Sequence, residues 1–238
     1  MAGADVLTAR PKSDLPVRIA SAVVMLAILG VAIWLNDPYK MALILLVGLV
    51  CFIEFASLVF KATDNLVYRA VALLFGAAYI GAAVYAMTML PLQGFGAAIG
   101  VVVFTDVFAY FAGRGIGGPR IAPRISPSKT WAGLFGGMIG AALFVAGLAY
   151  THFSIGGYSL SEMVAELGSQ IALMMALGAG LAVLAQAGDF FESWLKRKAG
   201  VKDSSKLIPG HGGVFDRIDG LLPVSIVVGY FAATAGMI

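Results

Sequence analysis

Long apolar stretches separated by short polar segments make up most of the sequence. A helix needs roughly 20 apolar residues to cross the hydrocarbon core of a bilayer, and several stretches come near this length. The pattern predicts an all-α, polytopic integral membrane protein with about seven transmembrane helices, in one transmembrane domain (residues 17–238) that follows a cytoplasmic segment (residues 1–16). We expect the helices at residues 17–36, 41–60, 70–90, 93–113, 131–150, 168–188 and 221–238.

Composition agrees with a membrane location. Of the 238 residues, 60% are hydrophobic and only 12% are charged, whereas about 25% of the residues in a soluble domain are charged. The mean hydropathy is +0.92. The single cysteine, Cys51, lies in an apolar stretch and leaves no partner for an internal disulfide. A soluble globular domain is therefore excluded.

The basic residues predict the orientation of the chain. Lysine and arginine accumulate in cytoplasmic loops of membrane proteins. With the N-terminus in the cytoplasm, every basic residue except Lys40 falls on that side. The first apolar stretch is longer than the ~7–15 residues of a signal-peptide core, so we expect a retained helix. The compact length and the lack of an organelle-targeting segment favour a multi-pass protein of a bacterial inner membrane.

Most polar residues gather in two expected cytoplasmic loops, residues 114–130 and 189–220. Glu54 and Asp106 lie in apolar stretches, both toward the cytoplasmic end. Because a carboxylate in hydrocarbon is costly, each needs a polar partner or water. A site at the cytoplasmic interface is therefore favoured over a path across the whole bilayer.

Carboxylates in the second loop occur in pairs with a three-residue spacing. Asp189 and Glu192 form one pair, and Asp216 and Asp219 form the other. On a helix this spacing puts both members on one face, where like charges repel unless a cation neutralises them. Mg²⁺ is usually held by one or two carboxylates together with substrate phosphates. The alternative is that these are solvated loop charges paired with Arg217, Lys196 or Lys202.

Basic residues and glycines in both loops are suited to binding phosphate. Lysine and arginine supply charge-assisted hydrogen bonds, and glycine-rich turns allow backbone N–H groups to approach an anion. Alternatives remain open: His211 as a turn residue, the basic run as an anionic-lipid anchor, and Ser128 or Thr130 as the N-cap of the fifth helix. The residues concerned are Lys196, Arg197, Lys198, Lys202, Lys206 and His211 with Gly210, Gly212 and Gly213, and in the first loop Arg114, Arg120, Arg124 and Lys129.

Small residues recur at four-residue spacing in the fifth stretch, as Gly133/Gly137 and Gly136/Gly140. This spacing lets helix backbones approach closely in lipid. Close packing within one chain is favoured over a contact between two copies.

The second loop resembles the signature of the phosphatidate cytidylyltransferase (CDP-diacylglycerol synthase) family. The matching run is Ser193-x-x-Lys196-Arg197-x4-Lys202-Asp203-x4-Ile208-Pro209-Gly210-His211-Gly212-Gly213-x2-Asp216-Arg217-x-Asp219. "DVFAYFAGR" followed by "ISPSKTWAG" resembles a second block of this family, and "IEF" at 53–55 an earlier acid-aromatic pair. The chain departs from the family pattern at Ser128, Ala132 and Gly220, where lysine, glutamate and serine are usual.

The resemblance implies an enzyme that condenses CTP with phosphatidic acid to give CDP-diacylglycerol and pyrophosphate, with Mg²⁺ and possibly a second cation as cofactors. It also implies a homodimer in the lipid bilayer, and no nucleic acid partner is expected. The implied metal ligands are Asp189, Asp216 and Asp219, which together with Lys202, His211 and Arg217 form the implied catalytic set. The implied substrate-binding residues are Lys196, Arg197, Ser126, Lys129, Thr130, Asp106 and Arg114.

Other functions are compatible with parts of this pattern. A CTP-dependent polyprenol kinase or a cytidylyltransferase for an ether-linked lipid would use a similar site with another lipid acceptor. A transporter with Glu54 and Asp106 as relay groups would need charged residues spread across the membrane depth. Here they cluster toward one end, which disfavours transport.

Overall fold

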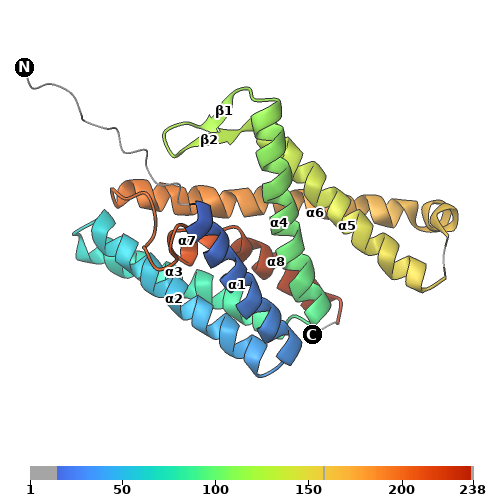
Figure 1. The fold of residues 1–238 in the computed structure, drawn as a ribbon, viewed down its shortest axis with the longest axis horizontal. Coiled ribbons are helices and arrows are strands. Elements are labelled where there is room, and N and C mark those ends of the chain that lie inside the picture. The colour runs from blue at the N-terminus through green and yellow to red at the C-terminus, as the bar shows by residue number, and fades with distance from the viewer. Residues whose placement is uncertain (1–14, 158, 237–238) are drawn as a thin grey trace, which may run out of the picture.

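The computed structural model describes residues 15–157 and 159–236, apart from the side chain of Glu166. The described part is mainly helical, with one small two-stranded sheet (Figure 1). The N-terminal residues 1–14, including Arg10 and Lys12, and the last two residues of the seventh predicted helix lie outside the described residues. In chain order the elements are α1 (Leu15–Leu35), α2 (Tyr39–Ala62), α3 (Leu66–Met89), α4 (Leu92–Gly115), β1 (Arg120–Ala122), β2 (Ser126–Thr130), α5 (Trp131–Ile155), α6 (Leu160–Lys198), α7 (Phe215–Ile218) and α8 (Leu221–Thr234).

Six of the described helices, α1 to α6, are long and apolar enough to cross a membrane. This confirms an all-α membrane protein. The seventh predicted helix is present as α8, but α8 has 14 residues, a length of about 21 Å at 1.5 Å per residue. Because the hydrocarbon core is about 30 Å thick, α8 is too short to cross it unaided, and the prediction of seven spanning helices is not confirmed.

The sequence prediction placed the end of the sixth helix too early. We expected a helix over 168–188 followed by a loop, whereas α6 continues without a break to Lys198. The 39 residues of α6 extend over about 58 Å, well beyond the thickness of the hydrocarbon core. Polar residues at the C-terminal end of α6 ended the apolar pattern, but they remain helical and stand on a rigid element.

Glycines of α5 allow it to pack closely on α4. A Cβ at Gly136 would lie 2.3 Å from Cβ of Ala112, and one at Gly140 would lie 2.5 Å from the ring of Phe108. These contacts leave no room for a larger residue on this face of α5. Close packing of these glycines within one chain is therefore confirmed.

The first polar loop forms a β-hairpin that the sequence pattern did not predict. Strands β1 and β2 pair antiparallel, with Arg120 opposite Thr130. Thr130 ends β2 and also caps α5, because its side chain accepts a hydrogen bond from the Gly133 N–H at 3.1 Å. The N-cap role considered for Thr130 is confirmed, and the cap sets the direction in which α5 leaves the hairpin.

A buried apolar cluster joins α2 to the C-terminal third of the chain. Phe55 and Leu58 of α2 pack with Leu195 of α6, Phe215 of α7 and Leu222 of α8. The rings of Phe55 and Phe215 meet edge to face with their centroids 6.1 Å apart. This cluster fixes α7, and with it Asp216 and Asp219, against α6.

Candidate active site

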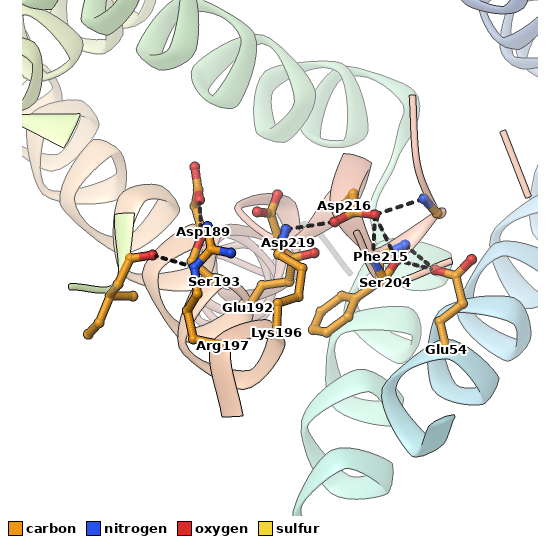
Figure 2. A network of polar contacts seen from close by, with 12 residues as sticks. Glu54, Asp189, Glu192, Ser193, Lys196, Arg197, Ser204, Phe215, Asp216 and Asp219 are labelled. Carbon is orange, nitrogen blue, oxygen red and sulfur yellow. Dashed lines mark hydrogen bonds and ion pairs between the residues drawn. The ribbon is translucent and has the colours of Figure 1, made fainter. Parts of the chain in front are cut away.

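The C-terminal end of α6 carries the acidic part of the site. Asp189, Glu192, Ser193 and Lys196 are spaced by three or four residues, so they share one face of the helix. Figure 2 shows these side chains along α6, facing Asp216 and Asp219. The one-face prediction for Asp189 and Glu192 is therefore confirmed.

Three carboxylates converge on this face. Oxygens of Asp189, Glu192 and Asp219 lie within 4.8 Å of one another. The close approach needs Gly188, because a Cβ there would lie 2.2 Å from the carbonyl oxygen of Asp219. A carboxylate cluster of this kind matches the oxygen ligands that Mg²⁺ prefers.

Glu192 supplies a second observation, besides the convergence of the carboxylates, that points to a cation site. Its side chain is almost fully buried, at 1% exposure, and its Oε1 has no hydrogen-bond partner among the described residues. Buried polar atoms are normally paired, because an unpaired one keeps the full cost of its desolvation. A cation held by the three carboxylates would supply the missing partner, so these residues fit a divalent metal ion.

The environment of Asp219 disfavours its ionised form. Burial, and next the negative charge of Asp189, raise the pKa of Asp219 to about 7. One hydrogen bond, from the Gly220 N–H to Oδ1 at 2.9 Å, acts in the opposite direction. Without a cation, the cluster therefore holds more protons near pH 7 than three isolated carboxylates would.

Asp216 lies outside the cluster of three carboxylates. The family resemblance implies Asp216 as a metal ligand beside Asp219, and this stays a prediction; in the structure Asp216 accepts hydrogen bonds from other donors. Oδ2 of Asp216 accepts hydrogen bonds from the Gly213 N–H at 2.7 Å and from the N–H and Oγ of Ser204, both at 2.9 Å. Burial opposes ionisation of Asp216, but hydrogen bonds from Glu192, Lys196 and these backbone groups outweigh it and hold its pKa well below the ordinary value.

Lys196 connects the cluster to Asp216. Its Nζ lies 2.5 Å from Oε2 of Glu192 and 2.7 Å from Oδ1 of Asp216 (Figure 2). A lysine shared by two buried carboxylates keeps both in place, and its removal would leave uncompensated buried charge. Lys196 is therefore paired with two carboxylates in this structure, and its predicted contact with substrate stays a prediction.

Glu54 of α2 holds the second loop from the other side. Its Oε1 accepts hydrogen bonds from Ser205 Oγ at 2.6 Å and the Val214 N–H at 3.1 Å. Its Oε2 accepts from Ser204 Oγ at 3.0 Å and the Phe215 N–H at 2.7 Å (Figure 2). The polar partners that the sequence analysis required for Glu54 are therefore groups of the second loop, and Glu54 holds this loop where it enters α7.

A pocket of about 490 Å³ opens beside the acidic cluster. Lys129 of β2 joins the two, since its Nζ forms an ion pair with Asp189 and it also lines the pocket. The walls combine basic, acidic, hydroxyl and amide groups from α4, β2, α5 and α6. The lining residues are Asp106, Ala109, Tyr110, Gly113, Arg114, Ser128, Lys129, Thr130, Gly133 and Gln186.

The remaining predicted site residues lie around this centre. Ser126 is buried in β2, whereas Lys202 and Arg217 are exposed. Arg197 donates from Nε to the carbonyl oxygen of Ile125 at 3.3 Å and so links α6 to the hairpin. The two polar loops therefore contact each other, as the sequence predicted for a shared site.

His211 is held against α1 by one of its ring nitrogens, and the catalytic role that the resemblance implies for it stays a prediction. Gly210 and Gly212 on either side have positive φ values of 76° and 86°, so this segment is a tight turn that glycine permits. Nδ1 of His211 lies 2.7 Å from Oγ of Ser21, which also donates to the carbonyl oxygen of Pro209 at 3.0 Å. These contacts attach the glycine-rich turn to α1.

Sequence reasoning missed several residues of the site. Gln186 and Ser204 gave no signal, because a single amide or hydroxyl in such a context has no diagnostic spacing. The hairpin was missed because its strands are short and contain Pro127. Glu192 was noticed as the partner of Asp189, and its burial is what marks it as a member of the cluster.

Comparison with known sequences agrees with this geometry. Residues 59–235 match the sequence model of the cytidylyltransferase family. The chain belongs to the cytidylyltransferase family. The match covers α3 to α8 entirely, and with them the acidic cluster and the pocket.

Individual relatives share the name phosphatidate cytidylyltransferase. A protein of Rickettsia felis is 32% identical over 221 residues, which cover 90% of each chain. One of Thermotoga maritima is 38% identical over 181 residues, 72% of this chain and 64% of the relative. One of Brucella abortus (strain 9-941) is 46% identical over 133 residues, 56% of this chain and 44% of the relative. The chain thus aligns with less than half the length of the Brucella protein.

Proposed function

We propose that the chain is a phosphatidate cytidylyltransferase, which condenses CTP with phosphatidic acid to give CDP-diacylglycerol and pyrophosphate. The observation that carries the proposal is the acidic cluster of Asp189, Glu192 and Asp219, joined through Lys129 to a pocket with basic and hydroxyl walls. Carboxylates that hold a cation beside basic groups that hold phosphate are what nucleotidyl transfer needs. Membership of the family and the names of the relatives support the same reaction.

Mg²⁺ is the proposed cofactor, held by Asp189, Glu192 and Asp219. When bound, Mg²⁺ would neutralise charge on the triphosphate and the leaving pyrophosphate. A second cation is compatible with the excess of carboxylates. Asp216, with Lys196, would keep Glu192 oriented and would not contact the ion directly, so this assignment differs from the ligand set implied by the family resemblance.

The protein's own residues would bind and orient both substrates. Arg114, Lys129 and Thr130 would bind phosphate oxygens in the pocket, with the exposed Lys202 and Arg217 adding positive charge on the loop side. The attacking group is a lipid phosphate, which is already an anion, so no strong general base is required. Catalysis would then rest on positioning and on stabilising negative charge.

The proposed setting is the cytoplasmic face of a bacterial inner membrane. A site at the end of α6, beyond the apolar part of the helix, would meet lipid headgroups and remain open to a water-soluble nucleotide. The excess of basic residues at this end supports the cytoplasmic orientation. The homodimer that the family resemblance implies stays a prediction.

Pyrophosphate release by the purified protein in detergent tests the proposal. CTP, Mg²⁺ and phosphatidic acid would be supplied together, and each would be omitted in turn. We expect release only with all three, and CDP-diacylglycerol as the lipid product. Release that requires an ether-linked lipid phosphate in place of phosphatidic acid would contradict the acceptor. Formation of CDP and a polyprenyl phosphate from CTP and a polyprenol, or no release from folded protein that binds CTP, would contradict the reaction.

A further inference from the structure

Gln186 carries a buried amide that the structure does not satisfy. Its side chain is 3% exposed, and its Oε1 has no hydrogen-bond partner among the described residues. An amide buried without a partner costs free energy, so a residue kept in this state needs a reason.

Gln186 faces the pocket. It lies on α6, three residues before Asp189, so both side chains share one face of the helix. It lines the same 490 Å³ pocket as Asp106, Arg114 and Lys129. On the other side the amide lies close to α5 at Gly137, where an added Cβ would lie 3.3 Å from Nε2 of Gln186. The amide therefore lies at the pocket wall, against the backbone of α5.

The groups on the walls indicate which substrate enters. Arg114 and Lys129 are hydrogen-bond donors that suit phosphate oxygens. The carboxylate of Asp106 and Oε1 of Gln186 are acceptors, and they need a ligand that brings donors of its own. Ionised phosphatidic acid has phosphate and ester oxygens, which only accept, whereas the nucleoside of CTP has ribose hydroxyls and the cytosine amino group.

We propose that this pocket holds the nucleoside of CTP and that Gln186 binds it through a hydrogen bond accepted by Oε1. The lipid would then approach the acidic cluster from outside the pocket. The inference rests on the proposed function and assigns one substrate to one part of the site. Gln186 is in this account a substrate-binding residue that the sequence motifs did not indicate.

The substitution Gln186→Met tests the proposal, because methionine keeps the length of the side chain and removes the amide. Gln170→Met is the matched control, since Gln170 is an exposed residue of the same helix. Binding of CTP and of inorganic tripolyphosphate would be measured on detergent-purified protein with Mg²⁺ and no lipid. We expect Gln186→Met to weaken CTP binding about tenfold, equivalent to about 1.4 kcal/mol, with tripolyphosphate binding and the KM for phosphatidic acid unchanged.

Analogues of CTP test the same contact on the unaltered protein, so the result does not depend on how well a variant folds. We expect either 2′,3′-dideoxy-CTP or N4,N4-dimethyl-CTP to bind about tenfold more weakly than CTP. The penalty for the analogue that lacks the contacted donor should vanish in Gln186→Met, as in a double-mutant cycle.

Three results for Gln186→Met would overturn the inference. The first is an equal weakening of CTP binding and tripolyphosphate binding, and the second is a rise in the KM for phosphatidic acid with CTP binding unchanged. The third is no change in either binding affinity or in the KM. Full turnover by the wild-type protein together with any of these leaves the proposed function standing and removes only the nucleoside assignment. A wild-type protein that neither binds CTP nor forms CDP-diacylglycerol would remove the proposed function itself.

Discussion

Replacement of Glu54 by glutamine should loosen the second loop without changing the shape of the side chain. Each carboxylate oxygen of Glu54 accepts one hydroxyl and one backbone N–H. In Glu54→Gln one of these oxygens becomes an NH₂ group. The serine hydroxyl beside it can rotate to accept, but the backbone N–H of Val214 or Phe215 cannot.

The structure allows the size of this effect to be worked out. One buried donor without an acceptor costs about 1–3 kcal/mol, and the bonds that remain lose the strength that the negative charge gave them. A cost of about 2 kcal/mol raises the open population of the loop about 30-fold. Because Glu54 holds residues just before Asp216 and Asp219, turnover should fall as well.

Trypsin provides the assay, since Lys202 and Lys206 are exposed in this loop. Cleavage of a locally opened segment follows its open population when reclosing is fast, so we expect about 30-fold faster cleavage in Glu54→Gln. Glu162→Gln is the control: Glu162 accepts from Ser159 in the capping box at the opposite end of α6, and its replacement should leave loop cleavage unchanged. Equal cleavage of wild-type protein and Glu54→Gln would refute the anchoring role.

Gly213→Ala should abolish turnover and speed loop cleavage, because the added Cβ would lie 2.1 Å from Ser204 Oγ and 2.4 Å from Glu54 Oε2; full activity would contradict the close approach. The raised pKa of Asp219, about 7, stabilises the metal-free protein at low pH, and this contribution is lost as the pH rises through 7. Mg²⁺ binds the ionised carboxylate, so the rise in Tm on adding Mg²⁺ should be larger at pH 8 than at pH 5.5. In Asp219→Asn this rise should be absent. A rise in Tm of the same size at both pH values would count against Asp219 as a metal ligand.

The length of the apolar stretches was sufficient to predict helices α1 to α5, because lipid requires long uninterrupted hydrophobic segments. It failed at the end of α6, where Asp189 ends the apolar run but not the helix. Hydropathy indicates whether a helix is surrounded by lipid or by water. A helix itself continues for as long as its residues can adopt helical backbone angles and form the i to i−4 hydrogen bonds. The long helix is what brings Lys196 to Asp216.

The site was predictable in composition but not in pairing. The three-residue spacing indicated four acidic residues as one group: Asp189, Glu192, Asp216 and Asp219. Only the tertiary structure shows that three of them converge while Asp216 pairs with Lys196. The partners of Glu54 lie about 150 residues along the chain, beyond the reach of any local pattern. Contacts of this kind are set by helix packing, which the sequence does not display.

The most direct test of the central claim is transfer of label from [α-³²P]CTP to lipid, measured for wild-type protein and Asp219→Asn in the same detergent. The account predicts labelled CDP-diacylglycerol from the wild type when phosphatidic acid and Mg²⁺ are present, and a loss of at least about a hundredfold in the variant with its folding unchanged. Label transfer at the wild-type rate by Asp219→Asn would contradict the claim that the acidic cluster is the catalytic metal site.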